Sequence, residues 1–220
     1  PFLGVAVGDV DNDGDPDLYL TGHRAGALWR NEGAGRFVDA TAGSGLDPQP
    51  WGTSASFADL DRDGRLDLVV ANYVRFEPER GTRTLCDFRG PGGESVLAAC
   101  GPREYVPLPA ALWRNAGGGR FVRIVPAPTR GRGLGVAVCD SDGDGRPRVA
   151  LANDEAPGDL LRPLPGAPLR LENVGDRSGT AYDREGKLHG GMGIDWGDAD
   201  GDGRPDLAVA TFEGEATSLY

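Results

Sequence analysis

The sequence of 220 residues is poor in lysine, histidine and cysteine: Lys187 is the only lysine, and there are two histidines and three cysteines. It also lacks long uninterrupted segments, because 36 glycines and 17 prolines divide it, and the longest stretch without either is 65–77. Glycine and proline destabilise helix interiors, which excludes helical bundles and doubly wound α/β folds. Without a run of about 18 apolar residues, no membrane-spanning helix is expected.

Basic residues are outnumbered, since 34 acids against 23 bases give a formal net charge of −11. This balance disfavours a nucleic acid or an anionic membrane as a partner. Sixteen of the acids lie in four short windows, which begin at Asp9, Asp59, Asp140 and Asp198. Carboxylates packed so closely repel one another unless a cation lies among them.

Four segments align without gaps through these windows: GVAVGDVDNDGDPDLYL from Gly4, SASFADLDRDGRLDLVV from Ser54, GVAVCDSDGDGRPRVAL from Gly135 and GIDWGDADGDGRPDLAV from Gly193. Each has an alternating apolar stretch, an acidic loop that follows D-x-D-x-D-G-x-x-D, and a second apolar stretch. The pattern predicts a strand, a tight loop and another strand in each repeat.

A second unit recurs after two of these segments. Leu-Trp-Arg-Asn at 28–31 and 112–115 is followed by a glycine-rich turn and Arg-Phe-Val at 36–38 and 120–122, which predicts a hairpin. One repeat thus holds about four strands in roughly 50 residues, the content of a propeller blade. We therefore predict an all-β fold, a β-propeller of four-stranded antiparallel blades.

The whole chain, 1–220, is expected to form a single propeller region of about three and a half to four blades. A closed propeller usually has at least four, so we expect this region to be part of a larger propeller with open sheet edges. Residues 75–109 form a long inserted loop between the second and third strands of the second blade. Because long loops on rigid scaffolds often carry binding, this insertion is the best candidate contact surface.

The acidic loops are predicted to bind Ca²⁺, since carboxylates at alternate positions converge on one point and glycine at position 6 permits the turn. Position 7 contributes its backbone carbonyl, and the acid at position 9 closes the coordination shell. The predicted ligands are Asp9, Asp11, Asp13, Asp15 and Asp17 in the first loop, Asp59, Asp61, Asp63, Arg65 and Asp67 in the second, and Asp198, Asp200, Asp202, Arg204 and Asp206 in the fourth.

The third loop differs, because Arg148 replaces the acid at position 9. Its aspartates, Asp140, Asp142 and Asp144, are expected to bind calcium weakly or not at all, with the guanidinium substituting for the ion. We therefore expect three calcium sites and a doubtful fourth. An EF-hand is excluded, since position 12 holds no acid and strands flank the loop. Merely polar turns are disfavoured, because a turn needs no carboxylate at three alternate positions.

These residues resemble the FG-GAP/VCBS repeats of integrin α-subunit propellers, and more closely the ASPIC/UnbV family related to cartilage acidic protein. The resemblance lies in Asn-Asp-Gly-Asp-Pro-Asp-Leu-Tyr at 12–19, the Leu-Trp-Arg-Asn units, Cys-Gly-Pro at 100–102 and Gly-Gly-Met-Gly at 190–193. It implies a calcium-binding β-propeller used outside the cytoplasm for adhesion or protein interaction.

Cys86 and Cys100 both lie in the insertion, and a disulfide between them would close a loop of about 15 residues, worth roughly 3 kcal/mol. Such a bond indicates an oxidising compartment, although a free pair or a metal site are alternatives. Cys139 is expected to be a small buried residue and not a nucleophile. The four tryptophans, Trp29, Trp51, Trp113 and Trp196, are expected to pack between blades, with sugar stacking by an exposed one as the alternative.

The leading hypothesis is a non-enzymatic calcium-binding propeller, secreted, periplasmic or on the cell surface, that presents loops to a protein or glycan partner. The first alternative is a calcium-dependent propeller enzyme of the polysaccharide lyase type, with His189, near Lys187 and Tyr182, as its base. We expect His189 to lie in a surface loop instead, and no nucleophile elbow, phosphate-binding loop or zinc spacing is present. A structural spacer is the third possibility.

Overall fold

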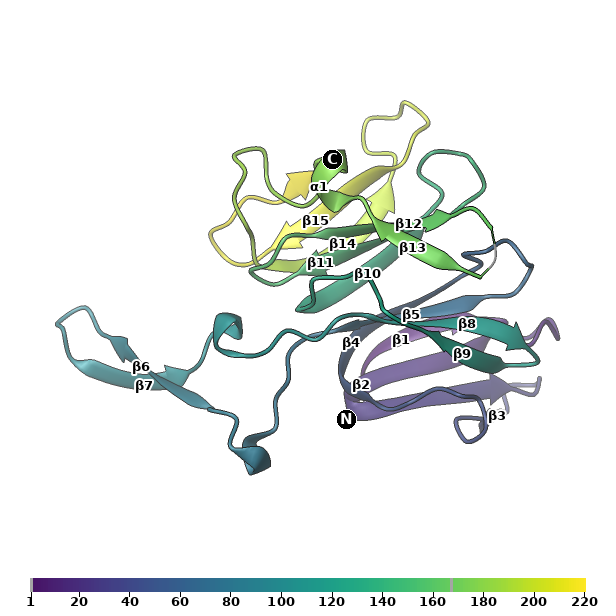
Figure 1. The fold of residues 1–220 in the computed structure, drawn as a ribbon, viewed down its shortest axis with the longest axis horizontal. Coiled ribbons are helices and arrows are strands. Elements are labelled where there is room, and N and C mark those ends of the chain that lie inside the picture. The colour runs from purple at the N-terminus through teal and green to yellow at the C-terminus, as the bar shows by residue number, and fades with distance from the viewer. Residues whose placement is uncertain (1, 167) are drawn as a thin grey trace.

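A computed structural model describes residues 2–166 and 168–220, and they form successive antiparallel sheets with very little helix (Figure 1). Each acidic loop joins the first strand of a sheet to the second, which is the order the repeats predict. These sheets confirm the predicted all-β fold of antiparallel propeller blades. None of the described helices is long and apolar enough to cross a membrane.

The first unit contains β1 (Phe2–Gly8), β2 (Asp17–Asn31) and β3 (Phe37–Asp39). β2 doubles back on itself, as shown by the hydrogen bond that the backbone N–H of Asn31 donates to Asp17 Oδ1 at 2.8 Å. In a straight strand, residues 14 positions apart would lie roughly 45 Å from each other. The reversal occurs near Arg24, whose φ of 53° is left-handed. β2 therefore supplies both the second and the third strand of the first blade.

The second unit has the full set of four strands, β4 (Gln49–Ala58), β5 (Asp67–Asn72), β8 (Ala111–Gly117) and β9 (Arg120–Ile124). Register is fixed by apolar pairs such as Leu68 opposite Trp113. β4 also pairs with the turn of β2, where His23 lies opposite Trp51, so the first two units join at one edge.

The third unit is equally complete, with β10 (Gly133–Cys139), β11 (Arg148–Asn153), β12 (Asp159–Leu164) and β13 (Arg170–Asn173). It forms a four-stranded sheet although it has no Leu-Trp-Arg-Asn sequence. Val149 pairs with Leu161 as Leu68 pairs with Trp113, which places Pro163 where the second unit has Asn115. After the short helix α1 (Gly175–Ser178) follow β14 (Gly191–Gly197), β15 (Asp206–Thr211) and β16 (Ser218–Leu219).

The hydrophobic core lies between successive units, not within them. Tyr19 and Trp113 are fully buried in the first cluster, and Val149 and Leu161 in the second. A third, smaller cluster packs Leu207 of β15 against the third unit. The first strands approach closely, since β10 contacts both β4 and β14. Burial of apolar side chains in these layers, at about 25 cal/mol per Å², holds the units together.

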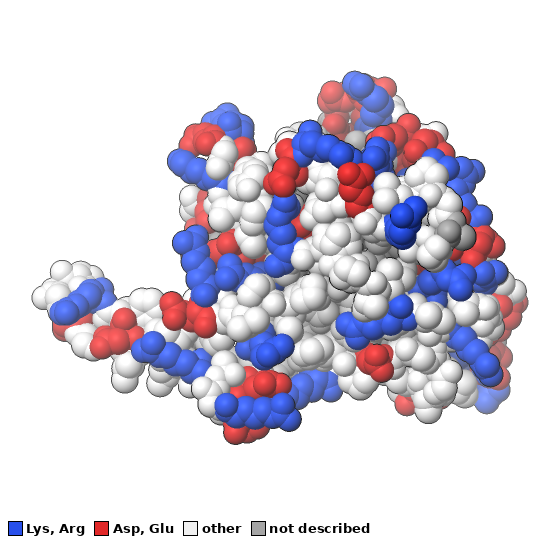
Figure 2. Space-filling model, in the orientation of Figure 1, with Lys and Arg blue, Asp and Glu red and all other residues white. Residues whose placement is uncertain are grey.

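Residues between β5 and β8 project from the body as an arm (Figure 1). The arm holds η1 (Pro78–Arg80), the hairpin of β6 (Leu85–Arg89) and β7 (Ser95–Ala99), and η2 (Pro102–Glu104). A disulfide joins Cys86 to Cys100, as predicted. Side chains of both charges, with uncharged surface between them, cover the arm (Figure 2).

An aromatic cluster anchors the base of the arm. The Trp51 ring lies 5.2 Å from that of His23 and 5.6 Å from that of Phe76. Because His23 belongs to the first unit and Trp51 to the second, Trp51 packs between two units, as predicted, and it also supports the base of the arm. It packs here because the turn of β2 and the residues after β5 meet at this end of the sheet, and aromatic edges attract aromatic faces.

Candidate metal centre

The four acidic loops share one backbone arrangement, set by the aspartate at position 1. In the first loop, Asp9 Oδ1 accepts a hydrogen bond from the N–H of Asp13 at 3.1 Å, and Asp9 Oδ2 accepts one from Gly14 at 2.8 Å. Position 1 of the other three loops accepts the same pair of bonds. Each loop is thus wrapped around its first carboxylate.

Two positions of each loop have a left-handed backbone. Position 6 is always glycine, and Gly14 has a φ of 96°, which explains the requirement for glycine. Position 4 is left-handed as well, with φ between 61° and 79° for Asn12, Arg62, Gly143 and Gly201. This second constraint was not predicted, although three of the four residues are asparagine or glycine, which tolerate that conformation.

In three loops, three aspartates bring carboxylate oxygens within 4.8 Å of one another. The groups are Asp9, Asp11 and Asp13 in the first loop, Asp59, Asp61 and Asp67 in the second, and Asp198, Asp200 and Asp206 in the fourth. Positions 1 and 3 belong to every group. The third member is position 5 in the first loop and position 9 in the other two, so Asp17, Asp63 and Asp202 lie outside the groups.

The aspartate at position 3 has an oxygen without a partner in the first two loops. Asp11 Oδ1 and Asp61 Oδ1 are shielded from solvent and accept no hydrogen bond from the described part of the protein. Leaving a buried carboxylate oxygen unpaired costs free energy, so both atoms suit a cation ligand. Burial raises the pKa of Asp11 and Asp61, and the neighbouring Asp13 and Asp63 raise it further.

The aspartate at position 9 ties the loop to the third strand of its sheet. Asp67 is fully buried, and its two oxygens accept hydrogen bonds from the N–H of Leu60 at 3.0 Å and of Asn115 at 2.8 Å. Asp17 accepts the corresponding bonds from position 2 and from Asn31 at 2.9 and 2.8 Å. Burial raises the pKa of Asp67 to about 7 despite these bonds. The backbone N–H of the asparagine in Leu-Trp-Arg-Asn therefore supports position 9 of the loop.

The residue at position 7 determines whether the carboxylate at position 5 can join the group. Arg65 and Arg204 occupy position 7 in the second and fourth loops, where they form ion pairs with Asp63 and Asp202. The first loop has Asp15 at position 7 and no such pair. An arginine at position 7 therefore draws the position-5 carboxylate away, which explains why position 5 joins the group only in the first loop.

The third loop keeps the backbone arrangement but not the group of carboxylates. Asp140 accepts its two bonds from Asp144 and Gly145 at 3.1 and 2.7 Å, as in the other loops. Arg148, which is 9% exposed, forms an ion pair with Asp142 at position 3. Here the compensating positive charge comes from the protein itself.

The donor set of the three groups consists only of carboxylate oxygens, since no histidine or cysteine belongs to a group within residues 2–166 and 168–220. Hard oxygen donors suit Ca²⁺ and Mg²⁺, whereas Zn²⁺ favours nitrogen and sulfur. Three carboxylates leave coordination positions for a backbone carbonyl and for water, as a shell of six to eight oxygens requires. The groups thus fit a calcium ion.

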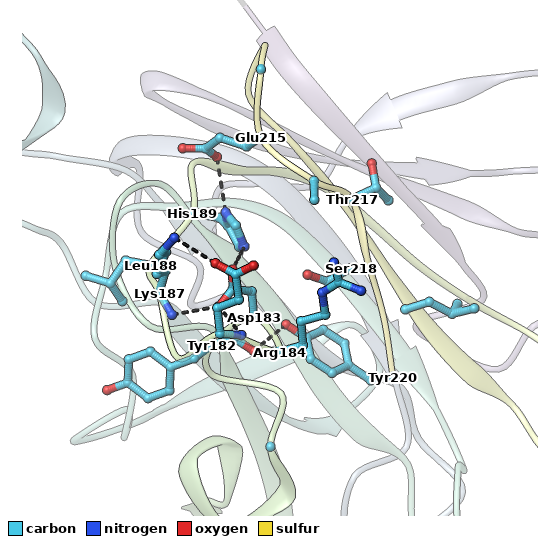
Figure 3. A pocket seen from close by; sticks show the side chains of 15 residues that line it. Tyr182, Asp183, Arg184, Lys187, Leu188, His189, Glu215, Thr217, Ser218 and Tyr220 are labelled. Atoms are coloured by element: carbon cyan, nitrogen blue, oxygen red, sulfur yellow. Dashed lines mark hydrogen bonds and ion pairs between the residues drawn. The ribbon is translucent and has the colours of Figure 1, made fainter.

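His189 lies in the loop before β14, as expected, and borders a cavity of about 690 Å³ (Figure 3). Its Nε2 lies 3.2 Å from Asp183 Oδ2, its Nδ1 lies 3.6 Å from Glu215 Oε2, and the side chain is 15% exposed. Both ring nitrogens thus face carboxylates, although Nε2 makes no hydrogen bond within the described residues. His189 links the segment before β14 to the turn before β16.

Cys139 is a free thiol at the end of β10 and is partly exposed, not buried as expected. Burial and the nearby Asp140 raise the pKa of its thiol. A thiol with a raised pKa is a poor nucleophile at neutral pH, so Cys139 is no candidate for catalysis.

Comparisons with known proteins find relatives for part of the chain. Residues 9–70 match the FG-GAP-like repeat family. Cartilage acidic protein 1 of Homo sapiens is 36% identical over 72 residues, and that of Mus musculus is 35% identical over 72 residues. Each alignment covers 32% of this chain and 11% of the relative, so the chain matches only a small part of these proteins.

Among solved structures, one concerns an Agrocybe aegerita lectin and its recognition of non-reducing terminal N-acetylglucosamine. It is 16% identical, and the match covers 92% of this chain and 59% of the lectin with a TM-score of 0.26, which supports no argument. The family match and the relatives confirm the predicted resemblance: the chain carries an FG-GAP-like repeat over residues 9–70 and is similar to part of cartilage acidic protein 1.

Proposed function

We propose that this chain is a calcium-binding β-propeller module that acts outside the cytoplasm by binding a protein or glycan partner. Calcium is held by the first, second and fourth loops, with Asp15, Arg65 and Arg204 adding their backbone carbonyls at position 7. The third loop binds calcium weakly or not at all. The FG-GAP-like repeat favours such a binding module over an enzyme.

One observation carries the calcium part of the proposal. Asp11 Oδ1 and Asp61 Oδ1 are buried, unpaired and grouped with two further carboxylates. A polar turn would have no reason to bury an unpaired carboxylate oxygen at position 3 of two successive loops, since the desolvation is unfavourable. A divalent cation removes both the unpaired oxygen and the repulsion within the group.

The bound calcium stabilises the blades. In the second and fourth loops, position 1 follows the first strand of the sheet and position 9 begins the second strand, so one ion joins two strands at their shared end. If free calcium exceeds the dissociation constant about tenfold, each site adds about 1.4 kcal/mol to the free energy of unfolding.

Isothermal titration calorimetry with calcium tests this proposal directly. We expect three sites in the natural chain and two in Asp61→Asn, which keeps the shape of the side chain but removes its charge. The matched control is Asp142→Asn, at the same position of the third loop, which should still show three sites. Absence of calcium binding to the natural chain, or an unchanged number of sites in Asp61→Asn, would contradict the proposal.

The Cys86–Cys100 disulfide supports a location outside the cytoplasm, because reducing conditions inside cells rarely leave such bonds intact. The arm is also the best candidate for the contact surface. Its hairpin has no core of its own, and Leu97 and Phe88 are 66% and 45% exposed. A two-stranded hairpin that exposes apolar residues gains stability when a partner covers them.

Partner binding can be tested on arrays of glycans and of extracellular proteins, each probed with and without EDTA. A partner that uses the arm should no longer bind the Leu97→Asp variant. It should still bind the Val122→Asp variant, which places the same charge on an exposed strand position of the body. Equal binding of both variants by every partner found would remove the arm from the proposal and leave the calcium sites untouched.

A further inference from the structure

Asn115 connects the first acidic loop to the second. Its side-chain Nδ2 donates to the carbonyl of Val10 at 2.8 Å, across 105 positions of sequence, and to the carbonyl of Leu66 at 3.1 Å. Its backbone N–H donates to Asp67 Oδ1 at 2.8 Å. Asn115 is fully buried. One residue therefore holds position 2 of the first loop and position 9 of the second.

A second link joins the same two loops at the surface. Asn12, at position 4 of the first loop, donates from Nδ2 to the carbonyl of Gly64 at position 6 of the second at 3.1 Å. Position 2 lies between the grouped residues Asp9 and Asp11, and position 6 lies within the second loop. Both links thus hold the loop backbone that orients the carboxylates of the first and second loops.

These links do not continue from the second loop to the fourth. In the third unit, register places Pro163 where the second unit has Asn115, and proline has no N–H to donate, so the link through Asn115 is not repeated between the second and third loops. Position 4 of the third loop is Gly143, which has no side chain to reach its neighbour. Position 9 of the third loop is Arg148, which pairs with Asp142. The fourth loop is therefore isolated from the first two within the described residues.

We propose that Asn115 and Asn12 couple calcium binding at the first and second loops, so that these two sites fill cooperatively while the fourth loop binds calcium independently. The inference rests on the proposed calcium sites and concerns this chain's own residues between them. A cation at the second loop fixes Asp67, and Asp67 fixes Asn115. Asn115 then holds the peptide between positions 1 and 3 of the first loop in the orientation that binding needs.

Coupling of this kind is reciprocal, and typical coupling between sites changes an affinity about 5- to 150-fold. Because only two hydrogen bonds cross between the loops, we expect an effect of about 5-fold, at the lower end of that range. Calcium at the first loop should strengthen binding at the second by the same factor, and the reverse should hold.

Two variants isolate the pairs of sites. Asp200→Asn removes the fourth site and leaves the first and second, so its calorimetric titration should be cooperative. Asp61→Asn removes the second site and leaves the first and fourth, so its titration should fit two independent sites. Combining both changes gives the first site alone, whose affinity should be about 5-fold weaker than in Asp200→Asn.

Substitutions of the linking residues complete the test in the Asp200→Asn background. Asn12→Gly is safe for folding because glycine stands at position 4 of the third and fourth loops, and it should reduce the cooperativity. Asn115→Ala should abolish it, with folding checked by circular dichroism. The matched control is Asn31→Ala, which keeps the backbone N–H that donates to Asp17 and removes only a side chain that donates to Pro16 within its own unit, so it should leave cooperativity unchanged.

The outcomes separate this inference from the proposed function. If calcium binds both loops of Asp200→Asn with affinities that the other site does not alter, the coupling is wrong and the calcium sites stand. If Asn12→Gly and Asn31→Ala have equal effects, the links through Asn12 and Asn115 are not the cause. If the natural chain binds no calcium, the proposed function itself fails.

Discussion

Arg148 forms an ion pair with Asp142, at the position where the first two loops each have a buried, unpaired carboxylate oxygen. The backbone of the third loop is otherwise the same, because Asp140 accepts the same two hydrogen bonds as its counterparts. The blade can thus be closed at this end by a guanidinium or, as we propose, by a metal ion. With Arg148 at position 9, the positive charge of the guanidinium takes the place that we propose for the metal ion in the other loops.

Arg148→Asp should therefore create a fourth calcium site. The new carboxylate would lack one of its partners, since Pro163 replaces the N–H that Asn115 donates to Asp67. We expect a site at least about tenfold weaker than the second, because one hydrogen bond to a charged group contributes about 1.5–3 kcal/mol. Calorimetry on Arg148→Asp and on Arg148→Asp with Pro163→Asn measures it, and the second change should tighten the site.

The same variant should lose stability when calcium is chelated. Removing the guanidinium deprives Asp142 of its partner and adds a fourth carboxylate, which we expect to lower the free energy of unfolding by about 1–3 kcal/mol. Urea unfolding in EDTA measures the loss, with Arg146→Asp as the control on an exposed side chain of the same loop. An equal loss in both variants would contradict the role assigned to Arg148.

Chelation of calcium from the natural chain should lower the thermal midpoint by about 10 °C. Three sites of about 1.4 kcal/mol each amount to about 4 kcal/mol. For a chain of this size, 1 kcal/mol corresponds to about 2–4 °C. Differential scanning calorimetry in calcium and in EGTA with magnesium provides the comparison at matched ionic strength. A midpoint that does not respond to chelation would indicate that the loops hold their shape without an ion.

The sequence was sufficient for the repeat architecture, because period-2 apolar stretches on both sides of each acidic loop leave little choice of register. It was sufficient for the disulfide as well, since Cys86 and Cys100 are the only cysteines in the insertion. The four-strand repeat also predicted separate second and third strands in the first blade, which β2 supplies, although its reversal at Arg24 has no glycine or proline at the left-handed position.

What the sequence could not provide are contacts between units. The bond from Asn115 to Val10 spans 105 residues and exists only because the second unit packs against the first. The contact of Trp51 with the base of the arm depends on where Phe76 and His23 meet it. Likewise, the pairing of Arg65 with Asp63 depends on side-chain direction, which residue spacing does not determine.

Loss of the disulfide should loosen the arm and spare the body. Cys86→Ser with Cys100→Ser removes a loop constraint worth roughly 3 kcal/mol in the chain-entropy model. Among the described residues, however, β6 and β7 form a separate two-stranded sheet, so this constraint acts on the arm. Limited proteolysis should therefore cut within residues 83–101 much faster, while the thermal midpoint of the body stays within about 2 °C. Cys139→Ser is the control, and a midpoint that falls with cleavage would show that the arm supports the core.

Acidity should act through Asp154, which is buried at the end of the blades away from the loops and accepts a hydrogen bond from the Tyr73 hydroxyl at 2.5 Å. Burial raises the pKa of Asp154 above its ordinary value of 3.8, and Glu155 adds to the rise. The folded state therefore holds this proton more tightly than the unfolded state. Stability from Asp154 is complete below pH 3.8 and is lost as the pH rises through the folded-state pKa.

Asp154→Asn cannot lose a proton and still accepts the Tyr73 hydrogen bond, so it should remove this pH dependence. In saturating calcium, the difference in the free energy of unfolding between Asp154→Asn and the natural chain should grow in favour of the variant from pH 4 upward. Urea titrations at several pH values measure this difference, with Tyr73→Phe as a companion. Phenylalanine removes the donor that favours the charged carboxylate, so the natural aspartate should become still less favourable at neutral pH. If the free energies of unfolding of the natural chain and of Asp154→Asn change with pH in parallel, Asp154 has the same pKa in the folded and unfolded states, and the prediction is wrong.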